Sequence, residues 1–288
     1  MKVEKYLVAP NKKINLSDYP TDVKDRSLSK REAVDLLHEG IQKMTVYQDK
    51  LYAYDKYAML IVFQAMDAAG KDGAIKHVMS GLNPQATQVY SFKQPSAEEL
   101  DHDYLWRVSK CLPKRGHIGI FNRSHYEDVL IVRVHNLLNH KKVPPALVTK
   151  DVWKRRFRQI TDFEKYIYEN GIVPLKFFLH ISKEEQRKRF LKRANEPAKN
   201  WKISSSDIKE RGFWKDYQKC YEEAISATSM KHSPWYIIPS DTKRYARLII
   251  SEIILKTFES MNLEYPKPSK EQLDYIEDYR KILNEEES

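Results

Sequence analysis

Residues 58–73, AMLIVFQAMDAAGKDG, contain the pattern that decides the fold of this 288-residue chain. The first six form an uninterrupted apolar run, which is typical of a strand buried on both faces of a parallel sheet. A loop of mostly small residues then leads to Gly70 and Lys71, and a helical stretch follows. This order predicts a P-loop, in which backbone N–H groups and the helix dipole bind phosphate.

The loop departs at two positions from the pattern G-x-x-x-x-G-K-[ST]. Ala65 stands where the first Gly belongs, and Asp72 stands where the Mg²⁺-binding Ser or Thr belongs. A tight strand-to-helix turn without a ligand is the alternative, but the strand context, Gly70 and Lys71 favour a phosphate site. A triphosphate would repel Asp67 unless a metal lay between them, which predicts that Asp67 coordinates Mg²⁺ or orients the acceptor phosphate. We expect Lys71 to follow the transferring phosphoryl group.

The rest of the chain alternates short β-rich runs with charged segments of helical periodicity. This alternation predicts a five-stranded parallel sheet with crossover helices, and therefore an α/β fold. The expected strands are 58–63, 88–92, 118–121, 173–181 and 235–238. The expected helices are 29–52, 96 to about 111, 149–170, a basic helix that begins after Ser182, and a tail helix that follows Pro268.

Composition excludes several classes of protein. The hydrophobic fraction of 41% excludes global disorder, and no apolar run approaches the roughly 20 residues of a membrane span. Two cysteines cannot form a disulfide framework, and the N-terminus lacks the apolar region of a signal peptide. We therefore expect a soluble, cytoplasmic protein.

The positive charge of the chain is concentrated in one segment. The net charge is +10, and residues 186–219 contribute 11 basic and 4 acidic side chains, whereas residues 265–288 have a net charge of −3. This distribution predicts a polyanionic partner: a nucleic acid, an anionic membrane surface or a phosphate-rich substrate.

A second polar cluster, NRSHYED at 122–128, follows the third expected strand. Ligands of open α/β sheets bind beyond the carboxyl ends of the strands, so this cluster is expected beside the P-loop. Asn122 stands where a Walker B Asp would lie, Arg123 is placed to contact phosphate, and Glu127 supplies a carboxylate one helical turn further on. For Asp128, we favour the alternative that it complements the dipole of a helix start.

The basic segment after the fourth strand occupies the position of the mobile lid of nucleoside monophosphate kinases, which excludes water and brings arginines over the phosphates. A solvated basic helix face is the alternative. Trp201, with Lys202 beside it, is the best candidate for stacking on a nucleobase. We expect an N-terminal extension with a helix at 1–54, a P-loop domain at 55–265 with a lid at about 194–215, and a helical tail at 266–288.

Three of these segments together resemble the polyphosphate kinase 2 family. They are FQAMDAAGKDG at 63–73, IGIFNRSHYEDVLIVRVH at 118–135 and KFFLHISKEEQRKRFLKR at 176–193, and the resemblance covers about residues 30–265. It implies phosphoryl transfer between inorganic polyphosphate and nucleotides with Mg²⁺, or Mn²⁺ in its place. The implied fold is a P-loop kinase, thymidylate-kinase-like and built of three αβα layers. NRSHYED resembles the subgroup that phosphorylates nucleoside monophosphates as well as diphosphates.

The resemblance also implies roles for individual residues. The implied catalytic residues are Asp67, Lys71, Arg123 and Glu127, of which Asp67 and Glu127 would hold the metal. The implied phosphate-binding residues are Ala68, Ala69, Gly70, Lys71, Asp72, Gly73, Arg123, Arg189 and Arg193. The implied nucleotide-binding residues are Asp67, Asn122, Trp201 and Lys202. By family analogy we expect a homo-oligomer, either a dimer or a tetramer, that binds neither nucleic acid nor membrane.

Two other functions stay open at this stage. An ATP-dependent nucleotide or small-molecule kinase would share the P-loop but would need a base pocket for its donor. A basic nucleic-acid-binding protein would show salt-dependent binding without turnover, but it leaves the P-loop and the acidic motifs unexplained. For a kinase of either type we expect in-line transfer without a covalent enzyme intermediate.

Overall fold

The computed structural model describes residues 2–23, 27–138 and 142–286, and it is built around one parallel sheet. The strands are β1 (Ala58–Ala65), β2 (Thr87–Ser91), β3 (Ile118–Asn122), β4 (Ile172–His180) and β5 (Trp235–Pro239), in the spatial order β2-β3-β1-β4-β5. The prediction of a five-stranded parallel sheet is confirmed. The P-loop strand β1 lies at its centre, between β3 and β4.

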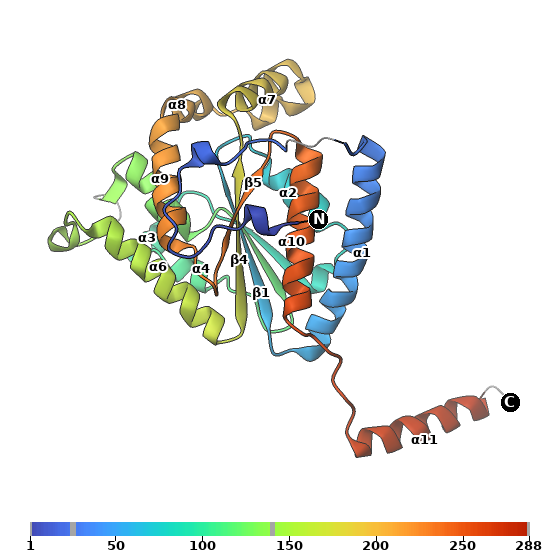
Figure 1. The fold of residues 1–288 in the computed structure, drawn as a ribbon. Coiled ribbons are helices and arrows are strands. Elements are labelled where there is room, and N and C mark those ends of the chain that lie inside the picture. The colour runs from blue at the N-terminus through green and yellow to red at the C-terminus, as the bar shows by residue number, and fades with distance from the viewer. Residues whose placement is uncertain (1, 24–26, 139–141, 287–288) are drawn as a thin grey trace.

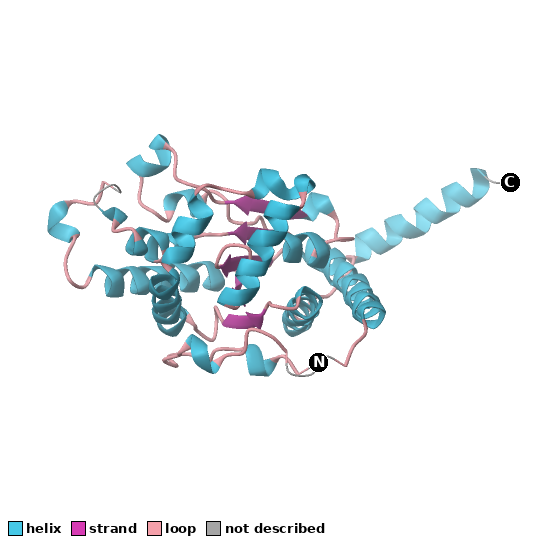
Figure 2. Cartoon of the chain, turned by 90° about the horizontal axis from the view of Figure 1, so that it is seen from above, coloured by secondary structure: helices cyan, strands magenta, loops and turns pink. Residues whose placement is uncertain are grey.

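Helices cover both faces of the sheet, so the fold has three layers (Figures 1 and 2). One face packs against α1 (Lys30–Tyr54), α2 (Lys71–Val78) and α10 (Lys243–Ser260). The other carries α3 (Ala97–Asp101), α4 (Trp106–Ser109), α5 (Ile131–Val134), α6 (Val152–Glu169) and α9 (Trp214–Thr228). Beyond the carboxyl end of β4 lie α7 (Lys183–Asn195) and α8 (Ser206–Gly212), above the sheet in Figure 1.

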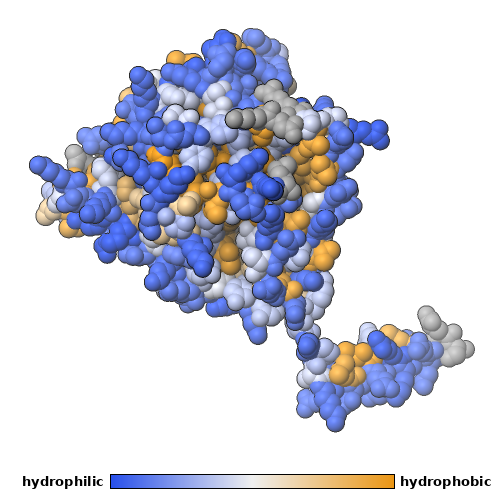
Figure 3. Space-filling view, in the orientation of Figure 1, coloured by the Kyte–Doolittle hydropathy of each residue, from blue (hydrophilic) through white to orange (hydrophobic). Residues whose placement is uncertain are grey.

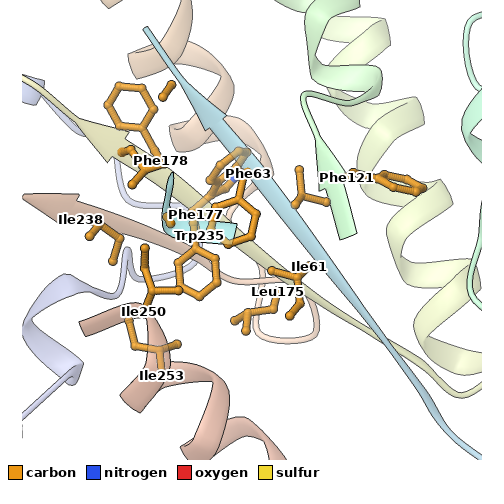
Figure 4. Close-up of a cluster of buried hydrophobic side chains, with 14 of the residues drawn as sticks. Ile61, Phe63, Phe121, Leu175, Phe177, Phe178, Trp235, Ile238, Ile250 and Ile253 are labelled. Carbon is orange, nitrogen blue, oxygen red and sulfur yellow. The ribbon is translucent and has the colours of Figure 1, made fainter. Parts of the chain in front are cut away.

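The core explains the uninterrupted apolar runs in the sequence. Every residue of β1 is buried, and Phe63 stacks on Phe177 of β4 with ring centroids 5.3 Å apart. Figure 4 shows Ile250 and Ile253 of α10 packing toward Trp235 of β5. Burying one such side chain completely contributes roughly 1.5–3 kcal/mol. The central strands are therefore fixed firmly, and the loops at their carboxyl ends rest on a rigid base.

One charged residue interrupts this apolar core. Lys176 of β4 is fully buried, and its Nζ donates to Glu164 (2.5 Å), to the hydroxyl of Tyr126 (3.0 Å) and to the carbonyl of Thr228 (2.8 Å). Tyr126 in turn donates to Glu164 across 2.9 Å. Because Tyr126 lies in the turn that follows β3, this network fastens the segment bearing Arg123 and Glu127 to β4, α6 and α9.

The helix expected from residue 96 to about 111 is wrong as a single element. The predicted capping box at Ser96 is present, but α3 ends at Asp101 and α4 begins only at Trp106. Between them, Oδ1 of Asp103 accepts from the backbone N–H of Leu105 across 2.8 Å. Such an Asx turn competes with the helical hydrogen bonds, and it breaks the helix into two short pieces.

The two ends of the chain behave differently. Near the N-terminus, Val3, Val8 and Leu16 are buried in the main core, and Val8 donates its N–H to the carbonyl of Trp235. At the other end, α11 (Lys270–Glu286) extends away from the body without one buried residue, and apolar side chains show on its surface (Figure 3). None of the helices described is long and apolar enough to cross a membrane.

Candidate active site

The loop between β1 and α2 has the backbone shape of an anion site. Ala68 (φ 61°) and Gly70 (φ 107°) both adopt left-handed conformations, the second of which suits only glycine. Gly70 is the N-cap of α2 and has no side chain to accept from the helix, and no described side chain is seen to accept from its first N–H groups. The first N–H groups of α2 are therefore left for a ligand, at the positive end of the helix dipole.

Side chains of helix α7 hold this loop by donating hydrogen bonds to the carbonyl groups of the loop. Gln186 donates to the carbonyl of Asp67 (2.9 Å), and Nη1 of Arg189 donates to the carbonyls of Ala68 (2.9 Å) and Ala69 (2.7 Å). Three consecutive carbonyls are thus directed toward α7.

Arg189 has a structural use that the sequence did not predict. Its Nε donates to Glu185, and its Nη2 donates to the carbonyls of Ser240 and Asp241, so all five of its N–H groups have partners. The side chain borders the site but has no N–H left for phosphate in this structure. It instead joins the P-loop to the end of β5.

The four predicted catalytic residues lie within electrostatic reach of one another. Arg123 donates from Nη2 to Asp67 across 3.3 Å, and the backbone of Arg123 donates to the carbonyl of Phe63, which joins the ends of β3 and β1. Lys71 donates to the carbonyl of Ala65 across 3.2 Å. This cluster contains two cations and two carboxylates, which balances its charge before any substrate binds.

Burial and the neighbouring charges shift the pKa values of this cluster. Burial lowers the pKa of Lys71, and Arg123 lowers it further, while Asp67 and Glu127 oppose the shift. Burial raises the pKa of Glu127 against the opposing charges of Arg123 and Lys71. Burial disfavours the guanidinium of Arg123, but Glu127 and Asp67 outweigh it and raise the pKa of Arg123. Each charge therefore depends on the others, as expected for groups that act together on one substrate.

A large cavity, of about 830 Å³, opens between the P-loop and the lid segment, residues 194–215. Among the residues that the structure describes, ten Lys and Arg side chains line it against three aspartates. The basic ones are Lys71, Lys93, Arg123, Arg189, Lys192, Arg193, Lys199, Lys202, Lys243 and Arg247, and the acidic ones are Asp67, Asp72 and Asp207. So dense a positive lining suits a polyanionic ligand.

Sequence reasoning missed part of this lining. Lys93 follows β2, and Lys243 and Arg247 lie one turn apart at the start of α10, after β5. The signal was present, because two basic residues spaced i, i+4 follow the carboxyl end of a strand, where α/β sheets bind ligands. Glu127, in contrast, is not among the described residues that line the cavity, and its charge acts on Lys71 and Arg123.

The predicted lid residues are at the rim. The Trp201 side chain is 78% exposed and lines the cavity, with Nζ of Lys202 4.9 Å from its ring centroid. Arg193 lines the cavity too and lies 3.9 Å from Asp207. An exposed aromatic ring at the mouth of a charged cavity is free to stack on a flat ligand.

The site offers a metal only part of a coordination shell. No group of three or more His, Cys, Asp or Glu side chains that could hold a metal occurs in the described ranges. Mg²⁺ is commonly bound by one or two carboxylates together with substrate phosphates and waters, and the carboxylates of Asp67 and Asp72 in the cavity lining fit that role.

A second cavity, of about 360 Å³, lies beyond β2 and β3. It is formed by residues between α3 and α4, by the turn after β3 and by the start of α6. Tyr104, Leu100 and Val152 contribute apolar surface, and Arg107 and Arg156 contribute charge. Four carboxylates, of Glu99, Asp101, Asp103 and Asp128, accompany the four cations of the described lining, which is therefore close to neutral, unlike that of the cavity over the P-loop.

A P-loop under a dense positive lining is the arrangement that suits transfer of a phosphoryl group between two polyanions. The fold and the site therefore define a phosphotransferase of the P-loop kinase type. Comparison with known proteins narrows the class. The chain matches the family profile described as Polyphosphate kinase 2 (PPK2) over residues 27–266. The protein belongs to the polyphosphate kinase 2 family, as its motifs predicted.

Individual relatives agree with this assignment. The ADP-polyphosphate phosphotransferase of Rhodopseudomonas palustris is 49% identical over 93% of this chain and 93% of its own length. The AMP/ADP-polyphosphate phosphotransferase of Meiothermus ruber is 42% identical, over 92% of this chain and 96% of its own length. The crystal structure of polyphosphate kinase 2 from Arthrobacter aurescens is similar with a TM-score of 0.84 and 35% identity, covering 92% of each chain.

Proposed function

We propose that this protein catalyses Mg²⁺-dependent phosphoryl transfer between inorganic polyphosphate and nucleotides. The products would be ADP and ATP, or GDP and GTP, from the corresponding mono- and diphosphates. The observation that carries the proposal is the cavity over the P-loop, with ten basic side chains against three acidic ones. A donor composed only of phosphate needs such a surface and no base pocket.

The residues divide the work of an in-line transfer. Lys71 and Arg123 neutralise charge on the phosphoryl group in flight, and the N–H groups at the start of α2 hold its oxygens. Asp67 orients the acceptor phosphate and, with Asp72, would hold the metal, which would withdraw charge from the phosphate oxygens. Glu127, predicted as the second metal ligand, would instead act from outside the cavity lining, through its charge on Lys71 and Arg123. The lid, with Lys199, and Arg193 immediately before it exclude water from the cavity. No covalent enzyme intermediate is needed for this chemistry.

We propose both AMP and ADP as acceptors. The relatives named above differ on this point, since one is called an ADP enzyme and the other an AMP/ADP enzyme. The motif NRSHYED supports the dual choice by its resemblance to that subgroup. Asn122 and Asp67 would contact the nucleotide near its phosphates, and Trp201 and Lys202 would contact it from the lid.

The alternative functions have less support. An ATP-dependent kinase would use the same P-loop, but the cavity lining offers phosphate contacts far in excess of those for a base. A nucleic-acid-binding role would leave the buried charge cluster around Lys71 without a purpose. We further propose that the enzyme is a cytoplasmic homo-oligomer, a dimer or a tetramer.

The test is a comparison of donors and acceptors. Purified protein receives Mg²⁺ and long-chain polyphosphate with AMP or with ADP, and the same acceptors with ATP in place of polyphosphate. Lys71→Ala runs beside each reaction, and Lys76→Ala, an exposed lysine of the same helix, is the matched control. We expect ATP from both acceptors, lost in Lys71→Ala and kept in Lys76→Ala.

Each other outcome has a distinct meaning. Product from ADP alone would reject the dual-acceptor proposal and keep the rest. Transfer from ATP without turnover of polyphosphate would reject the proposed donor.

A further inference from the structure

A chain of hydrogen bonds connects the lid to the P-loop. Arg211, at the end of α8, donates from Nη1 to Oε1 of Gln186 across 2.8 Å and to the carbonyl of Lys183 across 2.8 Å. Gln186 in turn donates from Nε2 to the carbonyl of Asp67 across 2.9 Å. Helices α7 and α8, side by side in Figure 1, are thereby joined to the loop that carries the predicted acceptor-orienting carboxylate.

The two ends of this chain fix the Gln186 amide in one orientation. The carbonyl of Asp67 can only accept a hydrogen bond, and the guanidinium of Arg211 can only donate one. Turning the amide over would set its oxygen against the Asp67 carbonyl and its NH₂ against Arg211. Gln186 is 1% exposed, so the loss of either partner would leave a buried polar group without its hydrogen bond.

Gln186 and Arg211 act on the site from outside it. Gln186 and Arg211 are both absent from the described residues that line the cavity. The peptide group of Asp67 nevertheless lies at the site, and its side chain pairs with Arg123. A rotation of that peptide would move the carboxylate away from Arg123, and a misplacement of about 1 Å in a reacting geometry can reduce turnover about 100-fold.

We propose that Gln186 is a positioning residue through which the lid helix α8, by way of Arg211, sets the orientation of the Asp67 peptide in the P-loop. The arrangement of the P-loop then depends on the position of the lid: when Arg211 is in place, Asp67 is held toward Arg123. The expected effect on turnover rests on the proposed function. The coupling through these hydrogen bonds does not depend on it.

Two variants test separately the hydrogen bonds from Arg211 to Gln186 and from Gln186 to Asp67. Gln186→Glu keeps an oxygen for Arg211 and removes the donor to Asp67, and Arg211→Gln removes the lid end without changing the buried residue. Arg187→Gln is the matched control, because Arg187 is the next residue of α7, is half exposed and pairs only with Glu184 among the described side chains. For each protein, kcat and the KM for polyphosphate and for ADP are measured, together with Tm.

We expect kcat to fall about 100-fold in Gln186→Glu and at least tenfold in Arg211→Gln, with each KM within about threefold of wild type. The double variant should be no slower than Gln186→Glu alone, because the two changes interrupt one chain. Unchanged kcat in both single variants would overturn the proposal. A rise in the KM for polyphosphate at constant kcat would assign Arg211 to substrate binding and also overturn it.

Hydrogen exchange provides a readout that does not require turnover. Backbone amides of residues 66–73 should exchange faster in Arg211→Gln than in Arg187→Gln, because the P-loop loses its tie to α8. Equal exchange in the two variants would overturn the coupling even if activity falls. A wild-type protein that fails to use polyphosphate would reject the proposed function, and the exchange comparison would still decide the coupling.

Discussion

Asn122 at the end of β3 donates a 2.8 Å hydrogen bond from its amide to the carboxylate of Asp72 in the first turn of α2. In the common P-loop pattern the strand supplies the Asp and the loop supplies a hydroxyl. Here the carboxylate has moved to the loop and a neutral amide stands on the strand. The contact between strand and loop still has one negative charge, now on Asp72. The group that donates a hydrogen bond to this carboxylate is the amide of Asn122 in place of a hydroxyl.

This exchange predicts the behaviour of Asn122→Asp. Two carboxylates at hydrogen-bond distance cannot both stay ionised without a cation between them. In metal-free buffer we expect Tm to fall by about 2–4 °C, as for a loss of about 1 kcal/mol, and Mg²⁺ to restore most of it. Asn122→Ala, which loses the hydrogen bond without adding charge, is the control. If Mg²⁺ stabilises the two variants equally, the interpretation of this junction is wrong.

Arg247 should contribute to the binding of polyphosphate, a role that the sequence analysis did not assign to it. It lines the cavity from α10, and loss of one charge-assisted contact costs roughly 1.5–3 kcal/mol. We expect Arg247→Ala to raise the KM for polyphosphate about 10- to 100-fold, with a smaller effect on the KM for ADP. Arg158→Ala removes the same charge from an exposed position on α6 and should leave both constants unchanged. Equal effects of the two substitutions would exclude a specific contact by Arg247.

Glu164 should determine part of the acid sensitivity of the fold. Burial would raise its pKa, but Lys176 and His125 outweigh burial and lower the pKa to about 2. Because this value lies below that of the unfolded chain, the stabilisation is complete above about pH 4.5 and is lost as the pH falls toward 2.

The test is urea unfolding of Glu164→Gln at pH 7 and pH 3.5. We expect a loss of about 3–5 kcal/mol at pH 7, since Lys176 is left buried without its partner, and a flatter dependence on pH than in wild type. Glu169→Gln, on the exposed side of the same helix, should match wild type at both values. If the free energy of unfolding of Glu164→Gln fell between pH 7 and pH 3.5 as much as that of wild type, other carboxylates would account for the acid sensitivity.

Helix α11 should contribute little to the stability of the body. It has no buried residue. In the segment that precedes it, the hydroxyl of Tyr265 donates a hydrogen bond to Asp49 of α1. Deletion of residues 267–288 is expected to change Tm by less than about 2 °C in calorimetry. A larger fall would mean that the apolar side chains of α11, Leu273 and Ile276 among them, are covered in solution by a second copy of the chain.

The sequence predicted the sheet well because buried parallel strands have a composition that few other elements share. The apolar run at the start of β1 and the loop after it were sufficient to locate the P-loop. The break between α3 and α4 was not predictable from apolar spacing, since it depends on one Asp side chain that bonds its own backbone. Local competition of this kind leaves no periodic signal.

Charge alone could not assign the basic residues of α7. Arg189 and Arg193 are one turn apart and both border the cavity, yet the N–H groups of Arg189 are all bonded within the protein, whereas Arg193 pairs only loosely with Asp207 at 3.9 Å. The difference arises from the distance between α7 and the P-loop, which is a property of the tertiary structure. Lys243 and Arg247 carried a sequence signal, since they follow a strand, but only the order of the strands in the sheet shows that they reach the same cavity as the P-loop.

The carbonyl contacts of Gln186 and Arg189 bear on how such enzymes can be recognised and altered. Residues outside the P-loop sequence support the backbone conformation of the loop. The loop can therefore have Ala65 in place of a glycine and Asp72 in place of a hydroxyl residue and still keep that conformation. Selection for the shape of the loop then acts partly on Gln186 and Arg189, more than a hundred positions downstream. A search restricted to the loop would overlook such a protein, and an engineer who transplants the loop into another scaffold must transplant its distant supports as well.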